Sequence, residues 1–158
     1  MFTKLQKLLT ENQANFRVID HPSEGNSERV ASVRGTVIGQ GAKAMICTVK
    51  NTDFHVMTVV PGDCKVDFKK VARQFGRSKC SLLGAEQAVA LTGCQVGAIP
   101  PFTFWPELRL LVDPALLSRF DEIAFNAGQL DKSIVLASAD YVRIANPMLA
   151  DITVPGES

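Results

Sequence analysis

The chain has 158 residues, of which 46% are hydrophobic, and both values are typical of one globular domain. No run of 18 apolar residues occurs, which excludes a membrane-spanning helix, and residues 1–9 lack the apolar segment of a signal peptide, so we expect a cytoplasmic protein. The formal net charge of +1 argues against a protein that holds nucleic acid through the phosphate backbone alone, because each phosphate contact needs a cation.

In the first part of the chain, apolar residues and caps mark helices and strands in alternation. Phe2, Leu5 and Leu8 recur at helical spacing and predict an amphipathic helix. Ser27 is expected to cap a second helix and Gly35 to end it. The expected elements up to residue 60 are, in order, a helix over 2–12, a strand over 16–20, a helix over 27–34, and strands over 42–50 and 54–60 joined by a turn at 51–53.

In the rest of the chain the predicted elements are short and irregularly ordered. Asp67 and Ser138 are expected to cap helices, because both residue types bond the first amides of a helix. The elements are, in order, helices over 68–75 and 85–91, the segment 96–99, a strand over 108–112, a helical turn over 114–120, strands over 123–125 and 133–136, and a helix over 139–145. Because turns rather than crossover helices join many of the strands, we predict a single compact α+β domain over 1–158 around a curved, mixed sheet.

The cysteines do not resemble a metal site. The four lie 14 to 17 residues apart, at Cys47, Cys64, Cys80 and Cys94. Structural zinc sites use closely spaced ligand pairs, and no C-x-x-C pair occurs here. We therefore expect reduced, buried thiols, and neither a metal nor a cofactor.

A local basic stretch stands out from the otherwise balanced charge. It comprises Lys65, Lys69, Lys70, Arg73, Arg77 and Lys79. One interpretation is the solvated face of a helix, and the other is a weak contact surface for an RNA end. Neither interpretation requires tight, sequence-specific RNA binding, and both stay open.

The segment Gly39-Gln40-Gly41-Ala42-Lys43 has some features of a phosphate loop but fails as one. Ala44 stands where Ser or Thr is needed, and the glycines precede a strand instead of a helix. The dinucleotide pattern G-x-G-x-x-G is absent too, and so is the G-x-S-x-G motif of hydrolases. Two histidines in all neither support nor exclude a catalytic triad.

Three segments could carry chemistry, and each is weak alone. Lys43 shares a strand face with Met45 and Cys47, where an uncompensated charge is costly. It either reaches solvent from the strand end or stands at the rim of a pocket. The segment 97–102, with a glycine and a double proline, and the turn at 125–128 could each present backbone amides to a ligand.

Taken together, these segments resemble a known family. The order Gln40-Gly41-Ala42-Lys43-Ala44, Gly97-Ala98-Ile99-Pro100-Pro101 and Asn126-Ala127-Gly128-Gln129-Leu130 is similar to the YbaK/ProX editing family, which includes the insertion domain of bacterial prolyl-tRNA synthetase. The likeness runs from the first helix to about Ile144. Residues 93–102 and 119–128 look most similar to the freestanding YeaK-type branch.

The resemblance implies a barrel-like mixed sheet surrounded by helices, and an aminoacyl-tRNA deacylase acting in trans. Such an enzyme hydrolyses the ester between a small amino acid and the 3′ adenosine of tRNA; serine is favoured, with threonine, alanine and cysteine as alternatives. Lys43 matches the essential lysine. The implied substrate contacts are His21, Gly97, Ala98, Ile99, Pro100, Asn126, Ala127 and Gly128.

The resemblance also implies a reaction without a protein nucleophile, in which backbone amides and Lys43 stabilise negative charge and the ribose 2′-hydroxyl assists the water. The implied partner is aminoacyl-tRNA, and a synthetase is a further partner that the likeness allows. Two alternatives stay open. One is a non-catalytic module that binds an amino acid or a tRNA end, and the other is a thiol-dependent hydrolase that uses Cys47 or Cys94.

Overall fold

The computed structural model describes residues 1–155. In chain order the elements are α1 (Phe2–Glu11), β1 (Phe16–Asp20), α2 (Ser27–Arg34), the 3-10 helix η1 (Ile38–Gln40), β2 (Ala42–Val49), β3 (His55–Pro61), α3 (Phe68–Gln74), β4 (Cys80–Leu82), α4 (Ala85–Thr92), β5 (Leu108–Val112), α5 (Pro114–Arg119), β6 (Glu122–Gln129), β7 (Lys132–Ala137), α6 (Ser138–Ala145) and β8 (Met148–Leu149). Within residues 1–155, none of the helices combines the length and apolar character needed to cross a membrane.

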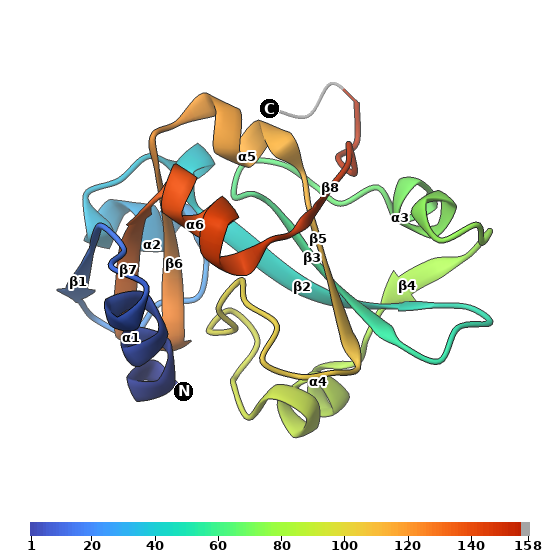
Figure 1. The fold of residues 1–158 in the computed structure, drawn as a ribbon, viewed down its shortest axis with the longest axis horizontal. Helices are drawn as coiled ribbons and strands as arrows, with labels where there is room; N and C mark the ends of the chain where they lie inside the picture. The colour runs from blue at the N-terminus through green and yellow to red at the C-terminus, as the bar shows by residue number, and fades with distance from the viewer. Residues whose placement is uncertain (156–158) are drawn as a thin grey trace.

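The strands form two sheets, and the predicted α+β class is confirmed. One sheet has the order β1-β7-β6 and is antiparallel; the other has the order β4-β2-β3-β5-β8, with β5 parallel to both of its neighbours. The expected closure of the strands into one barrel-like sheet is not observed. The two sheets meet at one isolated bridge between Gly41 and Ala124, beyond which β2 runs obliquely away from β6 to pair with β3 (Figure 1).

Most predicted elements match, but two of the predicted caps do not. The cap of α2 is Asn26, whose side chain accepts hydrogen bonds from the amides of Glu28 and Arg29, each at 3.1 Å. Ser138 is the first residue of α6 and its hydroxyl donates to the Phe120 carbonyl at 2.8 Å. In both helices the serine was expected at the N-cap, but the residue before it is the N-cap and the serine is the first helical residue.

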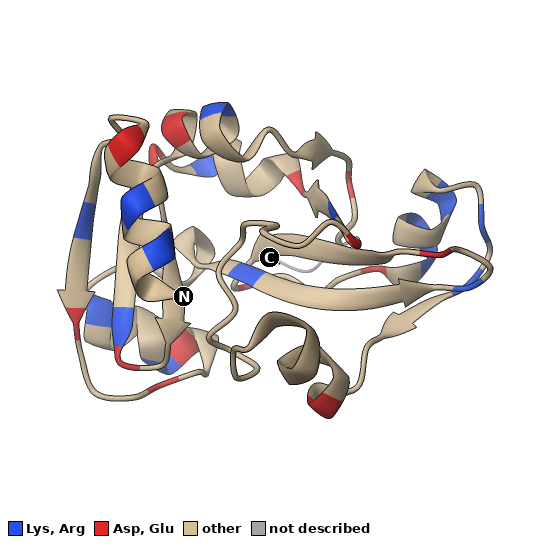
Figure 2. Ribbon diagram, turned by 60° about the horizontal axis from the view of Figure 1, so that its bottom comes forward, with Lys and Arg blue, Asp and Glu red and all other residues tan. Residues whose placement is uncertain are grey.

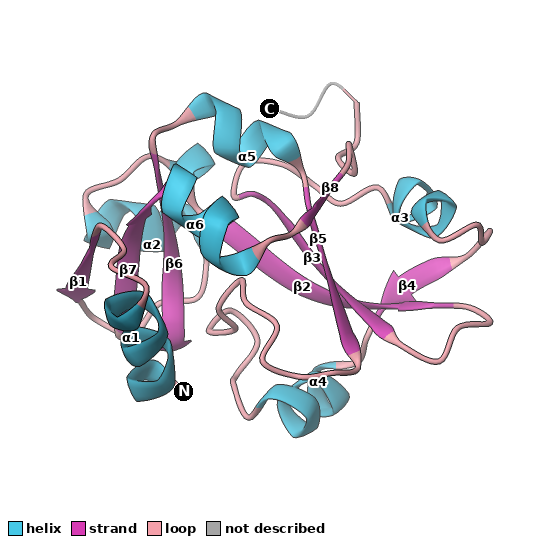
Figure 3. Cartoon of the chain, in the orientation of Figure 1, coloured by secondary structure: helices cyan, strands magenta, loops and turns pink. Residues whose placement is uncertain are grey.

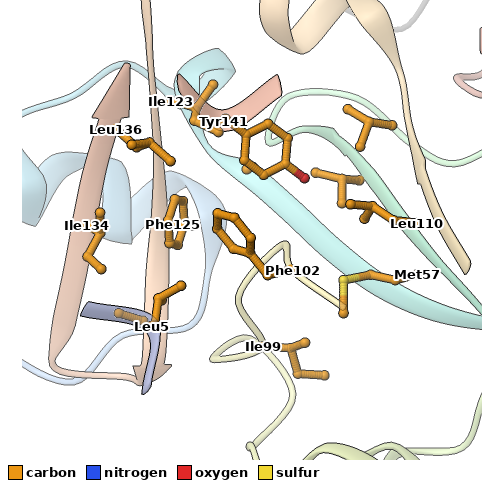
Figure 4. Packing of buried hydrophobic residues seen from close by; sticks show 14 of the residues in the cluster. Leu5, Met57, Ile99, Phe102, Leu110, Ile123, Phe125, Ile134, Leu136 and Tyr141 are labelled. Carbon is orange, nitrogen blue, oxygen red and sulfur yellow. The ribbon is translucent and has the colours of Figure 1, made fainter. Parts of the chain in front are cut away.

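The segment 93–107 runs mostly without regular structure between α4 and β5, as the loop colouring of Figure 3 shows. The core fixes the middle of this segment. Phe102 is buried and packs edge-on against Phe125 and Tyr141, with ring centroids 5.9 and 5.2 Å apart (Figure 4). The hydroxyl of the fully buried Tyr141 donates to the Pro101 carbonyl at 2.7 Å. The aromatic core therefore holds the residues that follow Gly97 in place beside β6.

A second, smaller apolar cluster lies under α3, at the far end of the five-stranded sheet. It contains Val49, Val56, Val60, Val66, Val71, Leu111 and Ile152. Asp67 caps α3 as predicted, since its carboxylate accepts from the amides of Lys69 and Lys70 at 3.0 and 3.3 Å. The basic stretch is thus carried by α3 and the segments on either side of it.

Candidate active site

A small cavity lies where the two sheets meet. It has a volume of about 60 Å³ and lies among the start of β2, the helix α2, the strand β6 and the segment at 97–99. Lys43, Gly97, Ile99 and Asn126, all predicted site residues, line it. A larger hollow of about 800 Å³ between α3 and β4 is lined by none of the predicted site residues, so we take the small cavity as the candidate site.

Lys43 stands at the mouth of this cavity. Together with Ser27 it also lines an outer hollow of about 370 Å³, so these two side chains separate the inner space from the outer one. The Lys43 ammonium donates to the carbonyl of Cys64. Because the side chain is partly buried, desolvation lowers the pKa of Lys43 from its ordinary value. An ammonium has three N–H donors, so two remain for a ligand at the mouth.

Asn126 ties two loops to β6. Its amide nitrogen donates to the carbonyls of Glu24 and Gly97, both at 2.9 Å. Gly97 has a φ of 94°, in the left-handed region that favours glycine, and its backbone lies against Gly25. These bonds hold the walls of the cavity at a fixed separation.

Four other residues predicted to contact the substrate lie behind the residues that line the cavity. Ala98, Pro100 and Ala127 are buried but do not line the cavity, and Gly128 donates its amide to the Ala98 carbonyl at 2.9 Å. Gly128 has a φ of 84°, and its Cα faces Met1 so closely that an added Cβ would lie 2.7 Å from the Met1 Cβ. The structure thus brings the segments 97–100 and 126–128 together. Their residues that do not line the cavity support those that do.

His21 does not line the cavity; it contacts Ser133, which in turn contacts the lining residues Arg34 and Asn126. Its Nε2 is 2.7 Å from the Ser133 hydroxyl and its Nδ1 is 2.8 Å from the Pro22 carbonyl. A carbonyl can only accept, so Nδ1 carries a proton. Ser133 is fully buried and also contacts Arg34 Nε at 2.6 Å and Asn126 Oδ1 at 3.0 Å. With its hydroxyl occupied on three sides, Ser133 is not placed to attack a substrate.

Arg34 is the site residue that sequence reasoning missed. Its side chain lines the cavity and is only 9% exposed. No Asp or Glu among residues 1–155 forms an ion pair with it, and burial lowers the pKa of Arg34 to about 10. The available signal was its helical spacing from the buried residues Val30 and Ala31, which places Arg34 on the inward face of α2.

The thiols do not support a cysteine nucleophile. Cys47 is fully buried, and its neighbour Cys80 and burial both raise its pKa. Cys94 is 1% exposed, and burial raises its pKa as well. A reactive cysteine needs a thiolate and access to substrate, and neither residue has them. In the part of the chain that is described, no group of three or more His, Cys, Asp or Glu residues could hold a metal ion.

Comparison with known proteins places this arrangement in a family. Residues 21–144 match the family model described as the aminoacyl-tRNA editing domain. The chain is 47% identical over 150 residues to the Multifunctional Ser/Thr-tRNA deacylase ProXp-y of Escherichia coli K12, covering 94% of this chain and 90% of that protein. It is 30% identical over 135 residues to EbsC of Enterococcus faecalis, named as a candidate Cys-tRNA(Pro)/Cys-tRNA(Cys) deacylase, covering 85% and 79% of the two chains.

Solved structures share the fold. The hypothetical protein APE2540 has a TM-score of 0.86 at 22% identity, with 96% of this chain and 99% of that chain covered. A structure described as a candidate trans-editing enzyme for prolyl-tRNA synthetase has a TM-score of 0.82 at 19% identity, with 97% and 96% covered. The predicted resemblance is confirmed: the chain belongs to the aminoacyl-tRNA editing domain family.

Proposed function

We propose that this editing hydrolase acts in trans on tRNA that carries serine or threonine, cleaving the ester between the amino acid and the terminal adenosine. The observation that carries the proposal is the cavity of about 60 Å³ with Lys43 at its mouth and Arg34 in its wall. A serine or threonine side chain matches a space that is this small and has hydrogen-bond donors. The 47% identity to a Ser/Thr-tRNA deacylase supports the same choice.

In the proposed reaction Lys43 is the catalytic residue and water is the nucleophile. The ester lies at the mouth, where the Lys43 ammonium keeps two donors beyond its bond to the Cys64 carbonyl. A positioned cation stabilises the negative charge that develops on the ester oxygen as water attacks, and such a group is commonly worth about 10²–10³-fold in rate. The ribose 2′-hydroxyl of the substrate would assist the water, since neither Ser133 nor the buried thiols can do so.

Gly97, Ile99 and Asn126 are proposed to contact the aminoacyl group, because they line the cavity. Ala98, Pro100, Ala127 and Gly128 would hold those walls from behind, and His21 would act through Ser133. The outer hollow beside Lys43 is the proposed place of the terminal adenosine. Association with a synthetase and action in the cytoplasm, where charged tRNA is used, belong to the same proposal.

The test is deacylation of a panel of tRNAs charged with serine, threonine, alanine, cysteine or proline by the purified protein, in excess chelator. We expect release of serine and threonine, with full activity in the chelator. A protein that binds these tRNAs but releases no amino acid would be a non-catalytic module instead. Activity that is lost in chelator and restored by zinc would contradict the metal-free mechanism.

A further inference from the structure

The fold alone does not explain why the Arg34 guanidinium is buried. A buried guanidinium without an anionic partner is costly, because burial removes its hydration. Two neutral groups hold Arg34: Nε donates to the Ser133 hydroxyl at 2.6 Å and Nη2 donates to Asn126 Oδ1 at 3.1 Å. These bonds occupy one edge of the planar group and leave Nη1 pointing elsewhere.

Arg34 lines the cavity, and its Nη1 forms no hydrogen bond within residues 1–155. Nη1 lies 3.9 Å from the point where a Cβ on Gly41 would stand, and Gly41 lines the same cavity. Since Gly41 has no side chain, nothing of its own fills the space in front of Nη1. The structure therefore presents a fixed pair of N–H donors to whatever occupies the cavity.

The lining residues distinguish the inner end of the cavity from its mouth. Lys43 and Ser27 line both the inner and the outer space, whereas Arg34 and Asn126 line the inner space alone. An ester held at Lys43 therefore directs the amino-acid side chain inward, toward Arg34. Because the space is about 60 Å³, the side chain that reaches this wall is a short one.

We infer that Arg34 is the residue that recognises the side-chain hydroxyl of the substrate, by donating a hydrogen bond from Nη1 to the hydroxyl oxygen. This inference rests on the proposed function and adds a basis for its selectivity. An amino acid whose side chain lacks the oxygen leaves the buried donors unpaired, and sites built to bond a hydroxyl reject such analogues strongly. Cysteine would also bind poorly, since its sulfur is a weak acceptor.

Ser133 and His21 act as positioning residues for Arg34, and Asn126 also holds Arg34 in addition to lining the cavity. The Ser133 hydroxyl accepts from Arg34 Nε, and its single proton goes either to Asn126 Oδ1 or to His21 Nε2. This arrangement fixes the plane of the guanidinium, and hence the direction of Nη1, without adding a negative charge that would attract the substrate ammonium.

The first experiment uses the unmodified protein and two substrates of the same shape. Valine has a methyl group where threonine has its hydroxyl, so one tRNA charged with either amino acid isolates the contribution of the oxygen. We expect kcat/KM to be at least about 100-fold higher for the threonyl ester. Equal rates for the two esters would overturn the inference and leave the proposed function standing. No hydrolysis of seryl or threonyl ester would instead overturn the proposed function.

The second experiment assigns the selectivity to Arg34. Arg34→Met keeps an unbranched side chain and removes the donors, so we expect the threonyl/valyl ratio to fall below about 10-fold, mainly through loss on the threonyl ester. Arg29→Met is the matched control, because Arg29 lies on the same helix with its side chain exposed, and its ratio should stay unchanged. A folded Arg34→Met protein that keeps the full ratio would contradict the assignment.

Ser133→Ala keeps the test decisive if Arg34→Met fails to fold. The change removes the Nε partner of Arg34 without a bulky replacement, so we expect a smaller loss of the ratio, with the larger decrease in kcat/KM on the threonyl ester. A thermal melt of each variant separates folding from selectivity. Equal losses on the threonyl and valyl esters would indicate a merely structural network and would overturn the role given to Ser133 and Arg34.

Discussion

Lys43 illustrates how one side chain can be both held and available. Its carbonyl partner, Cys64, fixes the ammonium at the cavity mouth, and partial burial lowers the pKa of the group while leaving it room to face a ligand. Among residues 1–155, no other lysine lines the inner cavity. Lys43, which the strand pattern singled out, is therefore one of the two residues, with Ser27, that line both the inner and the outer space.

Replacing Lys43 by Ala is expected to lower the deacylation rate about 10²–10³-fold, because a preorganised cation is removed from the reacting ester. The thermal melt should be nearly unchanged, since the truncation relieves a desolvation cost and leaves no apolar cavity. Lys7→Ala, at an exposed position on α1, is the control and should keep normal turnover. A Lys43→Ala protein with a normal melt and normal turnover would remove Lys43 from the mechanism.

Alkylation of the native protein is expected to leave its activity intact. Cys80 is the partly exposed cysteine, and its pKa is lowered by the neighbouring Cys47, so iodoacetamide should modify it first. Cys47 and Cys94 are buried and should react only on unfolding. Mass spectrometry of the modified sites beside a deacylation assay checks this, and inactivation that tracks modification of Cys47 or Cys94 would revive the thiol mechanism.

The site could be predicted from the sequence only where residue type and order carry information. The strand alternation and the family-like order of three segments pointed to Lys43, Gly97 and Asn126. They did not distinguish lining residues from supporting ones such as Ala98, because that difference depends on how two distant segments pack. Arg34 was missed since a basic residue in the last turn of a helix is ordinary there, and its burial is created by β6 and β7.

Among the elements, α2 positions Arg34, and its start therefore matters for the site. Asn26, and not the adjacent Ser27, satisfies the first amides of the helix. Asn26→Ala is expected to lower the free energy of unfolding by about 1 kcal/mol, the usual cost of losing an N-cap. Urea unfolding followed by circular dichroism measures this change.

Ser27→Ala is the matched control for the capping prediction. Its side chain takes no part in the cap, so the free energy of unfolding should stay within a few tenths of a kcal/mol of the unmodified protein. A larger loss for Ser27→Ala than for Asn26→Ala would restore the sequence-based cap and contradict the observed geometry.

Element prediction succeeded where local patterns dominate and failed where long-range pairing decides. The strands at 16–20 and 108–112 have the predicted bounds, because alternation and turn residues define them. The short edge strands β4 and β8 were missed, since strands of three and two residues exist only by pairing with β2 and β5. Closure of a barrel could not be judged either, because it depends on whether β2 and β6 pair beyond Gly41. That the whole of 1–158 is one editing domain stays a prediction.

At the scale of the whole molecule, charge is segregated more than the net value of +1 suggests. The segment 65–79 has six lysines and arginines against one aspartate, a net +5, so the rest of the chain carries −4. Figure 2 shows this basic segment gathered around α3, and Figure 1 places α3 at one end of the long axis. Beside it lies the hollow of about 800 Å³ between α3 and β4.

Charge reversal on α3 distinguishes the two interpretations of the basic stretch. If the segment contacts tRNA phosphates, the double variant Lys69→Glu and Arg73→Glu should bind tRNA more weakly. The slope of log affinity against log salt concentration should also become shallower, by the amount expected for the loss of roughly two phosphate contacts. Hydrolysis of a seryl ester of adenosine alone should be unaffected. Bare tRNA should bind weakly to the unmodified protein in either case, with an affinity that falls steeply as salt is added.

The control pair, Lys4→Glu and Lys7→Glu on α1, changes the net charge by the same amount. If both double variants behave alike on tRNA, the basic stretch is an ordinary solvated helix face. A selective loss for the α3 pair would show that the basic stretch contacts tRNA.

The concentration of positive charge at one end gives the molecule a dipole whose effects do not scale with its net charge. In the field of a polyanion such a protein is turned before contact, so encounter rates should depend on ionic strength more than a charge of +1 implies. The same property affects purification. At a pH near 7.7, the isoelectric point expected from the sequence, a protein whose positive and negative charges are evenly mixed passes through ion-exchange columns. Here the basic end should still bind a cation exchanger, and the acidic remainder should bind an anion exchanger.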